Sequence, residues 1–266
     1  MCGGGFLCAA ELWYNGVSVM TKVGFFDSGV GGTCILAAFR RLCPDVATEY
    51  LADSANGPYG NRPPEEIVRL SVANTEALLR RGCNVIVVAC NTATAAAIDH
   101  LRAQFPAIPF VGIEPALKPA ALRSKTGVVG VLATAGTFHG RLYNETKARF
   151  ATGVTVLAVV ADEFVQLVEE WKGGPTEKPL AGAFRDRVER TVRAKVEPLL
   201  KAGADKIVLG CTHFPHLKPI IEQVCAGRAE VIDPSDAVAR QIRRLIFRSP
   251  PPPCPSNSHI PLSTST

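Results

Sequence analysis

Two stretches of the chain decide the fold: VIVVACNTAT at residues 85–94 and KIVLGCTHFP at residues 206–215. Each begins with an aliphatic run that favours a strand and continues through a small residue to a cysteine. Threonine follows that cysteine at the next position or the one after it, and a helical pattern ending in glycine precedes each stretch. The match predicts two lobes of similar construction, with Cys90 and Cys211 each at the carboxyl end of a strand.

Short apolar runs alternate with longer amphipathic segments on both sides of these stretches. The alternation indicates parallel βαβ units, so the predicted fold class is α/β. We expect two pseudo-symmetric lobes with mainly parallel sheets flanked by helices, and an active site between the lobes. Strands are expected at residues 23–26, 50–51, 85–89, 110–113, 128–132, 154–160, 207–209 and 231–232. Helices are expected at residues 34–43, 64–81, 92–104, 137–150, 163–171, 180–202, 215–224 and 235–247.

The composition divides the chain into lobes and two terminal segments. We expect residues 22–115 and 232–248 to form the first lobe and residues 116–231 the second. Residues 1–21 precede the first convincing strand and are expected to be a flexible extension. Residues 249–266 are rich in Pro, Ser and Thr, which cannot pack a core, so a disordered tail is expected there.

The charge and the cysteines of the chain argue against several classes of protein. The net charge of +5 includes basic residues at helical spacing, Arg240, Arg243, Arg244 and Arg248, which are typical of a solvated helix face rather than a nucleic-acid surface. No apolar run reaches the roughly 18 residues of a membrane span. Nine cysteines without a CxxC pair predict neither a disulfide framework nor a metal site. These features indicate a cytoplasmic protein without nucleic-acid or membrane partners.

Both cysteines of the two stretches stand where a strand is expected to pass into a helix. The unpaired N–H groups and partial positive charge of a helix start lower the pKa of a thiol and bind a carboxylate. The residues that follow the cysteines can cap the helix or bind a ligand, and an imidazole can help a thiol gain or lose a proton. These residues are Asn91, Thr92, Thr212 and His213. Either cysteine alone is better interpreted as a small core residue, whereas the matched pair favours the catalytic interpretation.

A pair of thiols suits the inversion of an α-carbon. One group must remove a proton from one face while another delivers a proton to the opposite face. A thiol has an unperturbed pKa of about 8.5, which modest shifts bring near neutral pH. Two such groups can therefore run the reaction in both directions without a cofactor.

Two further segments are rich in polar and turn-forming residues. Asp27 and Ser28 follow the first strand and precede a glycine-rich turn that lets backbone approach a ligand. Asp27 could bind a substrate ammonium group, assist Cys90 or cap a helix. The turn lacks the GxGxxG and Walker patterns, so a nucleotide site is disfavoured. Tyr59 and Gly60 lie in a second loop that composition alone would place on the surface.

Taken together, these segments resemble the glutamate racemase family. The resemblance extends over about residues 23–248 and depends on four motifs whose order and spacing match. The motifs are FDSGVGG at residues 26–32, NGPYGNR at 56–62, ACNTAT at 89–94 and GCTHFP at 210–215. The stretch GIEPALKPAA at residues 112–121 is also similar to the junction between the family's domains.

The resemblance implies interconversion of L- and D-glutamate for bacterial peptidoglycan, without pyridoxal phosphate or metal. It implies that Cys90 acts on the D-enantiomer and Cys211 on the L-enantiomer, with Asp27 and His213 as assistants of the thiols. We also expect a homodimer. Substrate contacts are carried over to Asp27, Ser28, Tyr59, Gly60, Asn91, Thr92, Thr212 and His213.

Glu169 falls near a family glutamate that lies close to the site, but the sequence around it departs from the pattern. Ala161 and Asp162 replace the usual Cys-Pro, and an insertion-like stretch follows at residues 173–180. Phe214 stands where the family often has Tyr, a mild change.

Two other functions fit parts of the sequence. An aspartate racemase, or a decarboxylase or isomerase of related fold, would share the motifs, although a decarboxylase would be favoured by the loss of one thiol. A two-lobed protein that binds a small anion would explain the lobes but not the matched cysteines.

Overall fold

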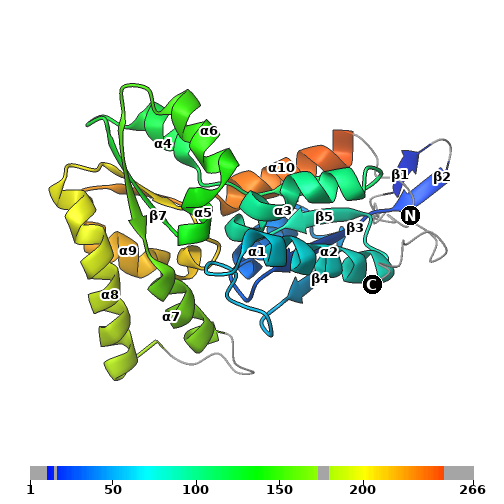
Figure 1. Ribbon diagram of the computed structural model, residues 1–266, viewed down its shortest axis with the longest axis horizontal. Coiled ribbons are helices and arrows are strands. Elements are labelled where there is room, and N and C mark those ends of the chain that lie inside the picture. Colours follow the sequence, from blue (N-terminus) through cyan, green and yellow to red (C-terminus); the bar gives the residue numbers. More distant parts are fainter. Residues whose placement is uncertain (1–10, 15–16, 173–179, 249–266) are drawn as a thin grey trace, which may run out of the picture.

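Two four-stranded parallel sheets form the framework of the protein and lie in two lobes next to each other (Figure 1). The computed structural model describes residues 11–14, 17–172 and 180–248. The strands are β1 (Glu11–Tyr14), β2 (Val17–Met20), β3 (Lys22–Asp27), β4 (Ala47–Ala52), β5 (Val85–Val88), β6 (Phe110–Gly112), β7 (Val128–Ala133), β8 (Thr155–Val160), β9 (Lys206–Leu209) and β10 (Glu230–Ile232).

Helices connect the strands of each sheet. They are α1 (Thr33–Leu42), α2 (Pro64–Arg80), α3 (Asn91–Gln104), α4 (Leu117–Arg123), α5 (Ala135–His139), α6 (Arg141–Phe150), α7 (Asp162–Lys172), α8 (Gly182–Lys201), α9 (Lys218–Cys225) and α10 (Ser235–Arg248). A 3-10 helix, η1 (Phe214–Leu217), precedes α9.

The first sheet has the order β4-β3-β5-β6 and is covered by helices on both faces. Successive residues of a strand point to opposite faces, so Phe25 and Phe26 of β3 enter different cores. Phe26 packs with residues of α2 and α3, and Phe25 packs with residues of α1 and α10. Burial of each phenylalanine contributes roughly 1.5–3 kcal/mol. The helix α10 thus returns to the first sheet after the chain has completed the second.

The second sheet has the order β10-β9-β7-β8. One core, which includes Phe164, Val192 and Ile221, joins the sheet to α7, α8 and α9. The other core joins the sheet to α4 and α6 through Leu117 and Tyr143. In both sheets all strand pairs are parallel. The carboxyl ends of β3, β5 and β9 carry Asp27, Cys90 and Cys211, which brings the predicted chemistry to facing sheet edges.

The α/β fold with two lobes is confirmed, with three local differences from the predicted elements. Residues 137–150 form two helices, α5 and α6, that meet at Gly140, where a Cβ would lie 2.5 Å from the Cβ of Ala95. The short helix α4 was not predicted. Residues 11–14 and 17–20 pair as an antiparallel hairpin, within a segment predicted to be a flexible extension. The predictions for residues 1–10 and 249–266 lie outside the described residues.

Within the described ranges, no helix combines the length and the apolar character that a membrane crossing requires.

Candidate active site

Cys90 and Cys211 line the same cavity, which lies between the two lobes and has a volume of about 20 Å³. Both side chains are buried. The sequence motifs converge on this cavity, together with residues of α7. Its lining consists of Ser28, Pro58, Tyr59, Gly60, Asn61, Cys90, Asn91, Thr92, Thr134, Asp162, Val165, Gln166, Cys211, Thr212 and His213.

Cys90 caps the amino end of α3. Its Sγ accepts a hydrogen bond from the backbone N–H of Ala93 at 3.4 Å and donates one to Ser28 Oγ at 3.8 Å. Burial raises the pKa of the Cys90 thiol well above 9, and the negative charge of Asp27 raises it further. Both effects favour the protonated thiol, which is the form that can deliver a proton.

Asp27 is fully buried beside Cys90 and holds the glycine-rich turn together. Its Oδ1 accepts a hydrogen bond from the Ser28 N–H at 2.7 Å, and its Oδ2 accepts one from the Gly32 N–H at 2.5 Å. Thr212 Oγ1 donates to the same Oδ2 at 3.1 Å. Burial raises the pKa of Asp27, although the charge of His213 and the backbone N–H groups oppose this.

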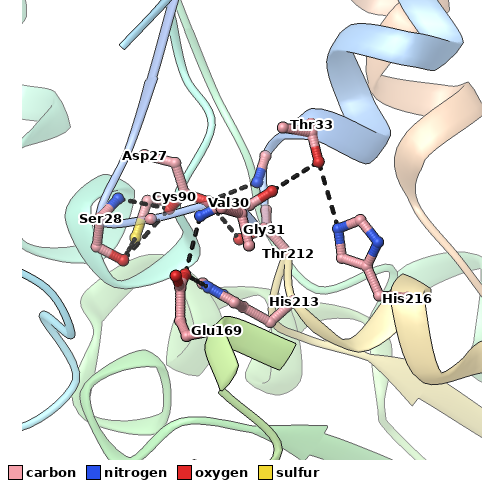
Figure 2. Close-up of polar contacts among 12 residues, drawn as sticks. Asp27, Ser28, Val30, Gly31, Thr33, Cys90, Glu169, Thr212, His213 and His216 are labelled. Carbon is pink, nitrogen blue, oxygen red and sulfur yellow. Dashed lines mark hydrogen bonds and ion pairs between the residues drawn. The ribbon is translucent and has the colours of Figure 1, made fainter. Parts of the chain in front are cut away.

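Cys211 lies next to the buried side chain of His213. On its other side, the His213 ring contacts the partly exposed Glu169 (Figure 2). The Cys211 Sγ is 3.7 Å from His213 Nδ1, and His213 Nε2 is 2.5 Å from Glu169 Oε1. The same Glu169 oxygen accepts a hydrogen bond from the Val30 N–H at 2.8 Å. Burial alone would lower the pKa of His213, but Cys211 and Glu169 outweigh it and raise this pKa to about 10. The ring is thus a cation at neutral pH.

Glu169 is the negatively charged partner of the cationic His213 ring. Burial would raise the pKa of Glu169, but His213 and the Val30 N–H lower it below its ordinary value. Glu169 does not line the catalytic cavity, but it lines a second cavity that adjoins it. The structure therefore brings together the two thiols, Asp27, His213 and Glu169, despite the altered sequence around Glu169.

The predicted binding residues differ in what they can offer a ligand. Asn91 is buried on the cavity wall, and its Nδ2 has no hydrogen-bond partner among the residues that the structure describes. An unpaired buried amide donor is costly, so this group fits a carboxylate ligand. Thr92 Oγ1 lies 2.9 Å from Thr134 Oγ1 across the two lobes, and it retains further hydrogen-bonding capacity.

Tyr59 is buried, and its hydroxyl is directed at Asp53 rather than left free. Asn74 also donates to that hydroxyl at 3.0 Å. Tyr59 and Gly60 both line the cavity. Because the hydroxyl is occupied, a contact from Tyr59 to a ligand would come from its backbone.

Sequence reasoning missed several residues of the cavity wall. Thr134 directly follows β7, so the rule that strand ends carry binding residues could have found it. Asp162, Val165 and Gln166 lie on one face of α7, with Glu169 one turn further on. No motif marks this face, because its residues are spaced along a helix rather than placed next to each other.

The catalytic cavity is narrow. A volume of about 20 Å³ accommodates roughly one water molecule. The adjoining cavity measures about 200 Å³ and shares Ser28, Pro58, Val165, Gln166 and His213 with it. An amino acid can reach the thiols only if the lobes separate or these side chains move. Among the described residues no group of three or more His, Cys, Asp or Glu side chains is arranged to hold a metal ion.

Comparison with known sequences identifies the family. The profile of the Asp/Glu/Hydantoin racemase family matches residues 33–242. A glutamate racemase of Roseiflexus sp. (strain RS-1) is 44% identical over 224 residues, covering 84% of this chain and 79% of that protein. A glutamate racemase of Herpetosiphon aurantiacus is 47% identical over 225 residues, covering 84% of each. The chain belongs to the glutamate racemase family. The resemblance seen in the four motifs is thereby confirmed.

Solved structures agree with this assignment. The racemase matches Escherichia coli glutamate racemase, crystallised with L-glutamate and the activator UDP-MurNAc-Ala, with a TM-score of 0.77 and 34% identity. That match covers 89% of this chain and 86% of the other. The Francisella tularensis enzyme in complex with D-glutamate matches with a TM-score of 0.71 and 25% identity, covering 86% and 81%.

Proposed function

We propose that the protein interconverts L- and D-glutamate by a two-thiol mechanism without a cofactor. The observation that carries this proposal is the placement of Cys90 and Cys211 on the wall of one cavity, each with its own acidic or basic partner. Asp27 belongs to the Cys90 side and His213 to the Cys211 side. The family membership supplies glutamate as the substrate.

In the direction from L- to D-glutamate, the Cys211 sulfur removes the α-proton. The C–H bond breaks, an S–H bond forms, and the electron pair remains on the substrate as a carbanion. The Cys90 thiol then delivers its own proton to the opposite face of the α-carbon. The reverse direction exchanges the two roles, so the thiols must return their protons to solvent or partner groups between turnovers. His213 and Asp27 are placed to exchange these protons.

Negative charge that develops on the substrate needs nearby donors. The amino end of α3, which Cys90 caps, presents backbone N–H groups and a partial positive charge. Asn91 adds an unpartnered amide donor. The cationic His213 contributes a full positive charge to the same cavity. The donors at the start of α3 and Asn91 support binding of the α-carboxylate, and the charge of His213 supports stabilisation of the carbanion.

The experiment that tests the proposal replaces each thiol separately. Purified Cys90→Ser and Cys211→Ser proteins are incubated with each enantiomer while optical rotation is followed. We expect both to lose racemisation with the circular dichroism spectrum intact. Cys43→Ser is the matched control, because Cys43 is also a buried free thiol but lies outside the cavity. Near-normal turnover in either active-site variant would refute the two-thiol mechanism.

The same assay decides between glutamate and aspartate. Both amino acids carry two carboxylates and differ by one methylene group, a difference worth roughly 1–3 kcal/mol in a fitted pocket. We expect turnover of glutamate to exceed that of aspartate. Activity on aspartate alone would replace the substrate while leaving the thiol mechanism in place. Glutamate binding without exchange of the α-proton would instead favour a binding protein.

We further propose that the product D-glutamate serves peptidoglycan synthesis and that the enzyme is a cytoplasmic homodimer. Free thiols at all cysteines of the described ranges support a reducing compartment. Light scattering of the purified protein measures the assembly directly. We propose residues 22–115 with 232–248 as one lobe and residues 116–231 as the other. Packing of α10 against α1 supports the first assignment.

A further inference from the structure

On each side of the cavity, one carboxylate accepts a hydrogen bond from the opposite lobe: Asp27 on the Cys90 side, and Glu169, which holds His213, on the Cys211 side. Among the described residues, Asp27 has donors from its own turn, Ser28 and Gly32, and one from the second lobe, Thr212. On the other side, Glu169 holds His213 next to Cys211 and receives the Val30 N–H from the first lobe. Figure 2 shows both contacts at the seam between the lobes.

We propose that Thr212 is a positioning residue for the Cys90 side of the reaction. Its hydroxyl completes the hydrogen bonds that hold Asp27 next to Cys90, so Asp27 is set for catalysis only when the lobes are closed. The proposal rests on the proposed function and deepens it. It gives Thr212, the residue next to one thiol in the sequence, a role in the chemistry of the other thiol.

The hydroxyl and the backbone of Thr212 have separate contacts, so the positioning role can be tested apart from a structural one. Thr212 is buried, and its Oγ1 lies 3.1 Å from Asp27 Oδ2. The backbone of Thr212 is held independently, since its carbonyl accepts a hydrogen bond from Cys34 Sγ at 3.4 Å. Removal of the hydroxyl therefore leaves the chain path intact and deprives Asp27 of one donor.

Lobe closure then controls the state of Asp27. Burial already disfavours the charged carboxylate, as the raised pKa of Asp27 shows. In an open form the hydrogen bonds from Ser28 and Gly32 would persist, because these residues share the turn with Asp27. The Thr212 hydrogen bond would be lost, because it crosses the seam. The hydrogen bond from Thr212 to the carboxylate thus forms in the same movement that closes the cavity around a substrate.

The decisive experiment is a double-mutant cycle of Thr212→Val and Asp27→Asn. We expect Thr212→Val to lower kcat by about 10- to 150-fold, the usual range for one hydrogen bond to a charged group. If Thr212 acts through Asp27, the double variant is no slower than Asp27→Asn alone. Thr212→Ser keeps the hydroxyl and is expected to restore most of the activity.

Deuterium isotope effects supply a readout that a structural role would not move. The equilibrium constant of a racemase is one, so kcat/KM falls equally in both directions. With α-deuterated substrates the two directions differ, because Cys90 removes the label from D-glutamate and Cys211 removes it from L-glutamate. We expect Thr212→Val to raise the isotope effect with D-glutamate and to lower it with L-glutamate.

Three outcomes would overturn the inference while the unmodified enzyme remains active. One is multiplication of the two single-variant losses in the double variant. Another is equal change of the isotope effects in both directions. The third is a rise in KM with unchanged kcat, which would make Thr212 a substrate contact only. The cycle is run on whichever amino acid the unmodified chain racemises. Absence of racemisation in that chain would instead refute the proposed function, and this inference with it.

Discussion

Replacement of His213 by glutamine tests whether the imidazole acts as the proton partner of Cys211. The ring is buried, and its pKa is raised from 6.5 to about 10. A shift of that size corresponds to roughly 5 kcal/mol in favour of the cation. Cys211 is the first of the groups that raise this pKa, followed by Glu169 and Asp27. A positioned proton carrier typically contributes at least about 10²-fold to a rate, or roughly 2.7 kcal/mol, so we expect kcat to fall by about 10²-fold.

The assay follows optical rotation from each enantiomer over a range of concentrations and pH values. Because glutamine removes a proton carrier and keeps a polar side chain, we expect KM to change by less than about threefold. Thermal unfolding by circular dichroism serves as the control for folding. A kcat within about threefold of the unmodified enzyme would refute the reasoning. So would a large rise in KM with kcat unchanged, since His213 would then only bind substrate.

Three further predictions concern binding, packing and pH. Asn91→Ala removes the unpartnered donor of the cavity wall and is expected to raise KM for both enantiomers by about tenfold, as initial rates would show. Gly31→Ala would place a Cβ 2.5 Å from His213 Nδ1 and 2.8 Å from the His213 backbone nitrogen, so we expect a loss of activity and a lower melting temperature; an unchanged melting temperature would contradict the closed packing. The stabilising effect of His213 should be fully present below pH 6.5 and lost as the pH rises towards 10, because the pKa of the folded state is the raised one. Urea unfolding of the unmodified and His213→Gln proteins at pH 6 and pH 9.5 measures this, and a stability difference that grows with pH would contradict it.

The sequence was informative wherever chemistry and local pattern coincide. Cys90 and Cys211 could be found because a strand, a small residue and a cysteine repeat in both lobes. The long amphipathic helices could be found because their apolar spacing is regular. The break at Gly140 could not, because it depends on the close approach of Ala95 from another helix. Both sides of that junction are helical, so local propensity gives no sign of it.

In the site, too, local features could be predicted from the sequence and contacts between distant segments could not. Asp27 and His213 are members of the sequence motifs, and their contacts with neighbouring residues follow from that placement. Thr134 could have been found from its place at the end of β7, whereas the inner face of α7 reaches the cavity only because the second lobe folds over the first. The sequence predicted that Tyr59 contacts the substrate. In the structure its hydroxyl is hydrogen-bonded to Asp53 instead. Such contacts depend on the path of the folded chain, so the neighbouring residues do not predict them.

The central claim is that two separate groups handle the α-proton, one on each face of the substrate. Incubation of L-glutamate in D₂O, stopped at low conversion and analysed by mass spectrometry of the separated enantiomers, tests it most directly. The account predicts that the D-glutamate formed carries deuterium at the α-carbon, while the remaining L-glutamate is almost unlabelled. Product that retains the original α-proton would mean that one group both removes and returns it, and would contradict the account.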